Sequence, residues 1–322
     1  MYIRRPCMRI QKLVSRITET ERLHQQAWNK VLYKSDAGLH GVTPWYAEDY
    51  DDSDWEKVDM FSDNWAIRNG RPLNGVHWFR KDFFVPEDWS GKEAVLRLGC
   101  IVDADSVFVN GHFVGTVSYQ YPPRIYKVPS KLLKKGKNQL TVRLFSYGGR
   151  PSFVKEKPYK LICDGKEVNL EGGWKHKIGT VMPPSPSSTA FHYTPVGLYN
   201  GMIYPLCHYT FKGVVWYQGE SNVGRWSEYS SLLSALIADW RTLFKDETLP
   251  FYIIELADFL ASDDPGRAAW AELRKQQAKT ARENAHVTLI KNSDTGEWND
   301  IHPLDKKTAA TRLVEAVIQN EK

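Results

Sequence analysis

The stretch Gly213-Val-Val-Trp-Tyr-Gln-Gly-Glu-Ser-Asn222 has the pattern of a short buried strand that ends in a polar loop. The same pattern recurs downstream, where strands are predicted between helices. The alternation of strands and helices predicts a parallel sheet in a three-layer α/β fold. In such sheets the functional residues lie in loops at the carboxyl ends of the strands. The predicted strands are 250–256 and 287–290, and the predicted helices are 228–244, 268–283 and 306–319.

Residues from about 46 to 160 have a different pattern, with short strands separated by turn residues. His77–Val85 is a predicted strand that stops at Pro86. Within 106–115, Asn110-Gly111 supplies the two residues of positive φ that a type I′ hairpin turn requires. Regularly spaced strands of this kind predict an antiparallel sandwich or jelly roll.

The composition excludes several classes of protein. The chain has 322 residues, of which 42% are hydrophobic and 25% charged, and its mean hydropathy is −0.48, which excludes disorder, collagen and a membrane bundle. The length suggests about two domains. The 43 basic and 38 acidic residues are interspersed, which argues against a nucleic-acid partner. The 12 Trp, 16 Tyr and 13 Phe indicate β-structure, a surface that faces carbohydrate, or both.

The four cysteines, Cys7, Cys100, Cys163 and Cys207, include no pair with CxxC spacing. The sequence therefore gives no support for a zinc or thioredoxin-like site, and we expect separate, mostly buried thiols with no metal or cofactor. The first ten residues are basic but lack the apolar region of a secretory signal. No run of the chain is long and apolar enough to predict a membrane span.

Two loops that follow predicted strands carry residues suited to catalysis. Gln218–Asn222 can point amide and backbone N–H groups at a developing oxyanion, or it can be an ordinary polar turn that caps a helix. His302 lies two residues after Asp300, and a histidine with a nearby acid can serve as the general base of acyl transfer. The alternative is a capping histidine in an Asp-rich loop.

Taken together, these motifs resemble the sialate O-acetylesterase family of SGNH-type hydrolases. The all-β section resembles the galactose-binding-like jelly roll that such enzymes carry inserted in the catalytic domain. The resemblance therefore implies an α/β fold with a three-layer SGNH-like parallel sheet and an inserted jelly roll. The motifs that carry it are 216–222, Tyr229, Leu232-Leu233, 239–241, 249–252, Leu273-Arg274, Gln277 and 300–303, with 52–55, 78–80, 89–91 and 109–111 in the all-β section.

The resemblance also implies roles for individual residues. The substrate would be an O-acetylated sialic acid or a related acetylated sugar, hydrolysed through a serine and a histidine without metal or cofactor. Members of the family are usually exported. The implied catalytic residues are His302 as base and Asp300 as the nearest acid. The acid of many SGNH enzymes lies three residues before the histidine, where this chain has Asn299, so either Asp300 or a backbone carbonyl would orient the ring. The implied oxyanion or active-site loop is Gln218, Gly219, Glu220, Ser221 and Asn222, and the implied supporting residues are Arg274 and Gln277.

The chain departs from the family pattern at the nucleophile. The family's serine lies in a Gly-Gln-Ser-Asn-Met block, and no such block is present in the 322 residues. We therefore expect an incomplete sheet that lacks its first strand and the nucleophile block. We also expect an upstream segment to supply the serine. The chain itself is expected to divide into three parts. These parts are a helical remnant of the catalytic domain (1–45), a jelly-roll β-sandwich (46–164) and the C-terminal part of the esterase domain (165–322).

Three other interpretations remain open at this level. Ser221 could be the nucleophile, although Val223 stands where an elbow would have its second glycine. The chain could be a poorly folded remnant of a gene. It could also be a catalytically inactive carbohydrate-binding fragment. The candidates for stacking on sugar in that case are Trp55, Trp78, Trp89, Tyr119 and Tyr121, and the favoured alternative for each tryptophan is burial in the core of the sandwich.

Overall fold

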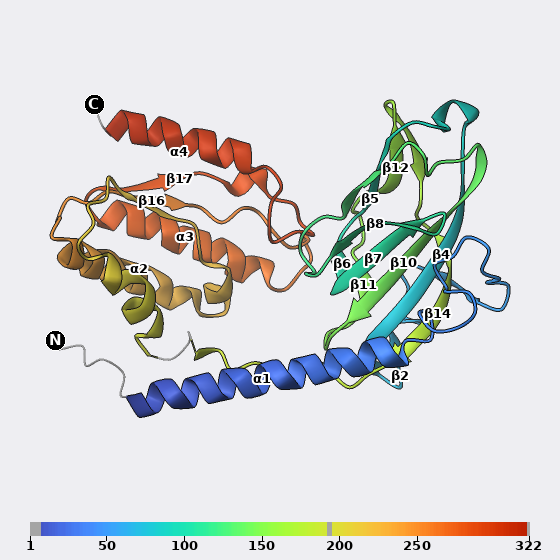
Figure 1. Ribbon diagram of the computed structural model, residues 1–322. Coiled ribbons are helices and arrows are strands. Elements are labelled where there is room, and N and C mark those ends of the chain that lie inside the picture. The colour runs from blue at the N-terminus through green and yellow to red at the C-terminus, as the bar shows by residue number, and fades with distance from the viewer. Residues whose placement is uncertain (1–7, 192–194, 321–322) are drawn as a thin grey trace. The chain divides into compact units, whose positions relative to one another are not determined.

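The structure is a computed structural model that describes residues 8–191 and 195–320. The chain forms two compact units, residues 1–189 and residues 190–322, which we call the N-terminal unit and the C-terminal unit (Figure 1). Cys7 lies outside the described residues. Cys100 and Cys163 are buried and Cys207 is partly buried, and none of the three forms a disulfide.

Two antiparallel sheets build most of the N-terminal unit. Their facing sides enclose one large apolar core, which contains Phe79, Leu96 and Leu144. This two-sheet arrangement agrees with the predicted sandwich. The six-stranded sheet has the order β1 (Glu56–Asp59), β14 (Gly173–Val181), β4 (Gly75–Val85), β10 (Gly136–Ser146), β7 (Ala104–Val109) and β8 (His112–Val117). The four-stranded sheet has the order β13 (Lys166–Asn169), β12 (Tyr159–Cys163), β5 (Ala94–Leu98) and β9 (Ile125–Val128).

Short elements complete the sandwich. Two small two-stranded sheets and one 3-10 turn lie in its loops. They are β2 (Ile67–Arg68) with β3 (Arg71–Pro72), β6 (Ile101–Val102) with β11 (Ser152–Phe153), and η1 (Glu87–Trp89). The hairpin between β7 and β8 turns at Asn110 (φ 48°) and Gly111 (φ 80°), which confirms the predicted turn.

Strand β4 is covered on both faces, because a helix packs on the outside of the six-stranded sheet. This helix, α1 (Met8–Ser35), buries Trp28 and Leu32 in a second apolar cluster with Val76 and Trp78 of β4. The indole N–H of Trp28 also donates to the carbonyl of Pro183 (3.0 Å). The helix therefore belongs to the sandwich unit.

The boundaries between the parts differ from those predicted. The predicted division at 164/165 falls between β12 and β13, which pair with each other. β14 then joins the six-stranded sheet, so the compact unit extends to Thr189. The sequence pattern missed this because β13 has only four residues and is mostly exposed, and β14 carries lysines between its buried residues.

Three tryptophans predicted as candidates for sugar stacking lie in the interior instead. Trp55 is 5%, Trp78 0% and Trp89 1% exposed. Trp78 faces the cluster beneath α1, and Trp89 faces the core between the sheets. These large side chains therefore stabilise the fold and have no face left for a ligand.

The C-terminal unit has a parallel sheet in the order β15 (Val214–Trp216), β16 (Phe251–Ile254) and β17 (Val287–Ile290). Helices α2 (Trp226–Phe244) and α3 (Arg267–Glu283) cover one face, and α4 (Lys306–Asn320) covers the other, as Figure 1 shows. The predicted helices and strands are confirmed to within a few residues at each end. Short turns complete the unit: η3 (Tyr199–Ile203), η4 (Tyr204–Leu206), η5 (Glu220–Arg225) and η6 (Ser293–Thr295).

The buried carboxylate of Asp36 provides a first test of the fold. Asp36 is 0% exposed and accepts hydrogen bonds from Trp78 Nε1 (2.9 Å) and Arg143 Nε (2.8 Å). Asp36→Ala leaves a buried guanidinium without its counter-ion, and we expect the free energy of unfolding to fall by about 3–5 kcal/mol in urea titrations. The control is Glu19→Ala, which removes an exposed pair with Arg22 and should leave the free energy of unfolding nearly unchanged. Equal losses in the two variants would contradict the assigned role of Asp36.

The buried histidine pair provides a second test. His77 Nε2 faces the carbonyl of Leu73 (2.8 Å) and must donate to it, so His77 Nδ1 accepts from His176 Nε2 (3.0 Å). Burial lowers the pKa of His77 to about 4, and burial together with His77 lowers the pKa of His176 to about 3. Both rings are thus neutral in the folded chain over a pH range in which the same histidines bind protons in the unfolded chain.

The stability that these rings contribute is present above about pH 6.5 and is lost as the pH falls toward the folded pKa values. For His77 alone we expect a loss of about 3 kcal/mol between about pH 7 and about pH 4, measured by urea unfolding. His77→Gln should flatten this dependence, whereas the exposed His112→Gln should leave it unchanged. A pH dependence as steep in His77→Gln as in the unchanged chain would contradict the assignment, since only the part due to His176 should remain.

Candidate functional site

Three loops meet at the carboxyl edge of the parallel sheet, where the sequence predicts function. They follow β15, β16 and β17, and they begin at Tyr217, Glu255 and Lys291. Because parallel strands all end at the same edge, these loops are neighbours. The side chains between them form two hydrogen-bonded groups, one around the Gln218 carbonyl and one around Asn292, which we together call the edge network. Its members are Tyr217, Gln218, Asn222, Tyr229, Glu255, Gln277 and Asn292.

The loop after β15 is held by one side chain from each covering helix. Tyr229 of α2 donates its hydroxyl to the carbonyl of Gln218 (2.8 Å), and Gln277 of α3 donates Nε2 to the same carbonyl (3.2 Å). Burial raises the pKa of Tyr229, so its hydroxyl stays protonated as a donor. The Oε1 atom of Gln277 accepts the backbone N–H of Leu256 (2.9 Å), and Gln277 is 0% exposed. Buried polar groups in a network of this kind fix the backbone that they bind.

The next peptide group is consequently fixed in direction. The Gln218 carbonyl points at Tyr229 and Gln277, and a trans peptide is planar, so the N–H of Gly219 points the opposite way. Gly219 has φ 151°, and a Cβ there would lie 2.8 Å from Leu273 Cδ2. Only glycine fits this position without strain or displacement of Leu273.

The other residues predicted for this loop surround the fixed peptide. Gln218 Nε2 donates to Asn222 Oδ1 (2.7 Å), and the backbone N–H of Asn222 donates to the carbonyl of Gly219 (2.9 Å). Glu220 and Ser221 begin the turn η5, where Ser221 is exposed and Glu220 partly buried. The structure thus brings Gln218, Gly219, Asn222 and Gln277 together.

The loop after β16 joins the other two loops, and the sequence analysis missed it. Glu255 Oε2 accepts the backbone N–H groups of Asn292 (3.2 Å) and Ser293 (3.3 Å). Asn292 is 0% exposed, and its Nδ2 donates to the carbonyl of Glu255 (3.1 Å) and to Tyr217 Oη (3.1 Å). One amide therefore ties the ends of all three strands. The strand-end rule that singled out the loops after β15 and β17 would have found Glu255.

Arg274, predicted as a supporting residue, lies beside an acid of the same middle loop. Its Nη1 is 3.1 Å from Asp258 Oδ1, and Arg267 Nη2 is 2.7 Å from Asp258 Oδ2. All three side chains are partly exposed, so the pairs are weakly stabilising. They position the loop after β16 on the N-terminal half of α3.

The predicted histidine lies in the loop between β17 and α4. Asp300 is buried, at 6% exposed, and its Oδ1 accepts the backbone N–H of His302 (2.8 Å), while the side chain of His302 is exposed. Asp300 therefore shapes the turn that presents His302. At the start of α4, Lys306 Nζ lies 5.1 Å from the ring centroid of Tyr217. This contact brings the segment that follows His302 to the end of β15, one residue before Gln218.

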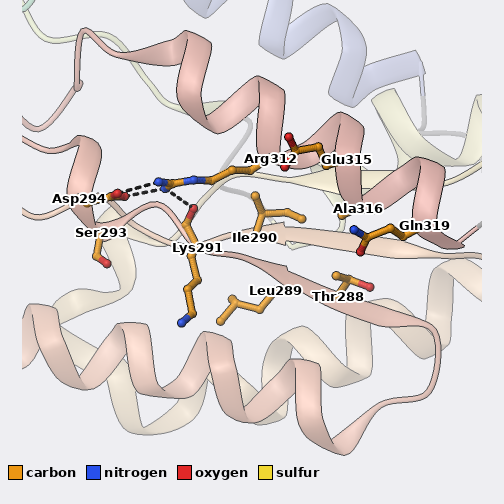
Figure 2. A pocket seen from close by; sticks show the side chains of 10 residues that line it. All are labelled: Thr288, Leu289, Ile290, Lys291, Ser293, Asp294, Arg312, Glu315, Ala316 and Gln319. Atoms are coloured by element: carbon orange, nitrogen blue, oxygen red, sulfur yellow. Dashed lines mark hydrogen bonds and ion pairs between the residues drawn. The ribbon is translucent and has the colours of Figure 1, made fainter.

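Figure 2 shows a separate cavity of about 600 Å³ beside β17 and α4. Arg312 forms two contacts of 2.6 Å with Asp294 at its rim and donates to the carbonyl of Lys291 (3.0 Å). None of the predicted site residues lines this cavity. It lies along the outer edge of the sheet and is not the candidate active site.

Two further observations concern only the described residues. Within 8–191 and 195–320, no group of three or more His, Cys, Asp and Glu side chains is arranged to hold a metal ion. Over the same part of the chain, no helix combines the length and the apolarity needed to cross a bilayer.

Comparison with known proteins finds one matching family model for each part of the chain. Residues 178–319 match the family described as carbohydrate esterase, sialic acid-specific acetylesterase. Residues 15–174 match the sugar binding domain of glycosyl hydrolases family 2.

Curated relatives match a portion of the chain. The sialate O-acetylesterase of Homo sapiens is 35% identical over 135 residues, which cover 36% of this chain and 25% of that protein. The sialate O-acetylesterase of Rattus norvegicus is 34% identical over 176 residues, which cover 49% of this chain and 30% of that protein. The match thus spans between a quarter and a third of the length of these relatives.

Solved structures show weaker likeness. A carbohydrate acetylesterase from Xanthomonas citri is 20% identical, with 68% of each chain covered and a TM-score of 0.34. A β-glucuronidase from Ruminococcus gnavus is 19% identical, with 37% of this chain and 23% of that chain covered and a TM-score of 0.26. These scores are too low to support a conclusion about the fold. The family match and the curated relatives point the same way: residues 178–319 are similar to the sialic acid-specific acetylesterases among the carbohydrate esterases.

Proposed function

We propose that the C-terminal unit forms part of an esterase site that removes O-acetyl groups from sialic acid or a related acetylated sugar. The observation that carries this proposal is the fixed Gln218–Gly219 peptide, whose N–H group is directed away from the covering helices. Donors with a fixed orientation stabilise the oxyanion of acyl transfer without reorganising during the reaction. We assign the Gly219 N–H and the Gln218 side chain to this role.

The remaining residues take complementary roles in a Ser–His acyl transfer. A serine Oγ attacks the acetyl carbonyl while His302 accepts the serine proton, and the sugar hydroxyl leaves with that proton. Water then hydrolyses the acetyl-enzyme with His302 as general base. We assign Asp300 to orienting His302, since Asp300 shapes the turn that presents it. Glu220, Ser221 and Asn222 form the wall beside the oxyanion donors, with Arg274 and Gln277 as supporting residues.

We infer that the nucleophilic serine comes from a segment outside the printed sequence. Among the described strands β15 pairs only with β16, so one edge of β15 can accept another parallel strand. Val215 of β15 is 53% exposed, whereas every residue of β16 is buried. Parallel sheets are normally covered on both faces. An added strand with its helix would cover the exposed face of β15 at Val215. Ser221 is the alternative nucleophile, and it lies on the same loop as the proposed oxyanion donors.

Substitution of His302 tests the proposed reaction. Acetate release from 4-nitrophenyl acetate and from mono-O-acetylated N-acetylneuraminic acid is measured for the chain alone and with a co-expressed segment containing Gly-Gln-Ser-Asn-Met. We expect His302→Ala to lower the rate by about 10³-fold or more, because the general base is lost. His208→Ala removes an exposed histidine of the same unit and should retain the rate.

The same assay identifies the source of the serine. We expect activity only when the segment is present, and Ser221→Ala should then retain most of it. Activity of the chain alone that disappears in Ser221→Ala would assign the nucleophile to Ser221. A His302→Ala variant as fast as the unchanged chain would contradict the proposal as a whole.

Substitution of Gln277 tests the fixed peptide. Gln277→Leu leaves the Leu256 N–H without its partner and the Gln218 carbonyl with one donor, so the free energy of unfolding should fall by about 1–3 kcal/mol. We also expect kcat to fall further than KM rises, because an interaction made in the transition state is weakened. Gln276→Leu, one residue earlier on the same helix, is the matched control. Unchanged kcat in Gln277→Leu would show that the peptide direction has no part in catalysis.

A further inference from the structure

The N-terminal unit contains a cavity of about 300 Å³ that the esterase proposal does not use. The volume is at the lower bound of ordinary ligand pockets and suits one small ring. Three segments form its walls: Asp103, which follows β6, the loop after β8, and the loop after β10. The lining residues are Asp103, Ser118, Tyr119, Gln120, Tyr147, Gly148 and Gly149.

A buried arginine fixes two of the three walls. Arg124 is 0% exposed, and its Nη1 donates to the carbonyls of Gln120 (3.0 Å) and Pro122 (2.7 Å). Its Nη2 donates to the carbonyls of Ile101 (2.7 Å) and Asp103 (3.2 Å). A buried guanidinium is costly unless all its donors are used, so these loops are held in one geometry.

The counter-ion completes this support. Asp105 is 0% exposed, and its Oδ2 lies 2.6 Å from Arg124 Nε. The hydroxyl of Tyr126 donates to the other oxygen of Asp105. The third wall is tied to the first, because the backbone N–H of Tyr147 donates to Asp103 Oδ2 (2.8 Å). The cavity is therefore preformed, and binding would require little ordering of its loops.

An exposed aromatic ring stands at the cavity. Tyr119 is 56% exposed, and its ring meets that of Tyr121 edge to face with centroids 5.0 Å apart. The neighbouring ring limits the positions that Tyr119 can take. Gly148 and Gly149 on the opposite loop carry no side chain, which leaves room for a ligand ring beside Tyr119. An aromatic face next to polar groups suits the apolar C–H face of a pyranose.

The charges of the lining decide which class of sugar fits. Asp103 is the one charged side chain among the lining residues. Arg150, next to Gly149 in the chain, pairs with Asp63 instead. A carboxylate accepts hydrogen bonds from sugar hydroxyls and repels a second carboxylate. Ser118 and Gln120 add neutral donors and acceptors.

We propose that this cavity is a binding subsite for a neutral hexopyranose, which stacks on Tyr119 and donates hydroxyls to Asp103. The subsite excludes sugars that carry a carboxylate, including free sialic acid. The subsite therefore prefers sugars without a carboxylate, whereas an esterase site for an acetylated sialic acid must accept a sugar that carries one. It stands on the geometry of the N-terminal unit and does not depend on the esterase proposal.

Titration of the whole 322-residue chain tests this proposal. Methyl β-galactopyranoside, methyl β-glucopyranoside and N-acetylneuraminic acid are titrated by calorimetry and by saturation-transfer NMR. We expect at least one neutral glycoside to bind and N-acetylneuraminic acid to bind at least about tenfold more weakly. Absence of binding by both glycosides, or equal binding of the acid, would overturn the proposal.

Three variants separate the subsite from general effects on the fold. Tyr119→Ala should weaken glycoside binding about tenfold, the equivalent of one lost stacking face, whereas the exposed Phe113→Ala on β8 should not. Asp103→Asn keeps an acceptor for the Tyr147 N–H but removes the charge, and it should raise the affinity for N-acetylneuraminic acid. Thermal unfolding checks that each variant is folded. Unchanged binding in Tyr119→Ala, or unchanged discrimination in Asp103→Asn, would contradict the assignment.

Discussion

Buried pairs of arginine and aspartate determine the geometry of the N-terminal unit. Arg143 with Asp36 fixes the end of α1 against β4 and β10, and Arg124 with Asp105 fixes two loops at one end of the sandwich. Such pairs contribute little net stability, because desolvation offsets the attraction between the charges. Their effect is to allow one loop arrangement, since any other would leave a charge buried without its partner. The loops that these two pairs contact therefore have defined positions.

The C-terminal unit holds the loop after β15 with neutral groups instead. Tyr229 and Gln277 donate to the Gln218 carbonyl, and the carboxylate of Glu255 binds the backbone at the start of the third loop, after β17. Neutral amides and hydroxyls hold a peptide without adding a field of their own. A site that must stabilise a transient negative charge benefits from this arrangement, since its donors keep their direction while the charge develops.

Local patterns in the sequence predicted the strands, helices and turns well. They predicted less well which side chains are buried and which groups these side chains hydrogen-bond. The Asn110-Gly111 turn and the strands that end just before Tyr217 and Lys291 follow from backbone preferences, which neighbouring residues alone decide. The burial of Trp78 depends on α1, more than forty residues away in the chain, and no local pattern contains it. The role of Asn292 likewise arises from three separate strands. The esterase family was predicted from ordered motifs, whereas the roles of single residues stay proposals.

The peptide between Gln218 and Gly219 is held from two helices at once, and this links its direction to how those helices pack. Deeper in the same interface, Thr280 of α3 donates to Ser230 of α2 (3.2 Å), and both side chains are buried. A larger or smaller side chain at Thr280 or Ser230 would shift α3 against α2. Because Tyr229 and Gln277 bind the Gln218 carbonyl from these two helices, that shift would rotate the Gln218–Gly219 peptide. The α2–α3 interface is thus a place where substitutions remote from the sheet edge can alter the polarity that the loop presents.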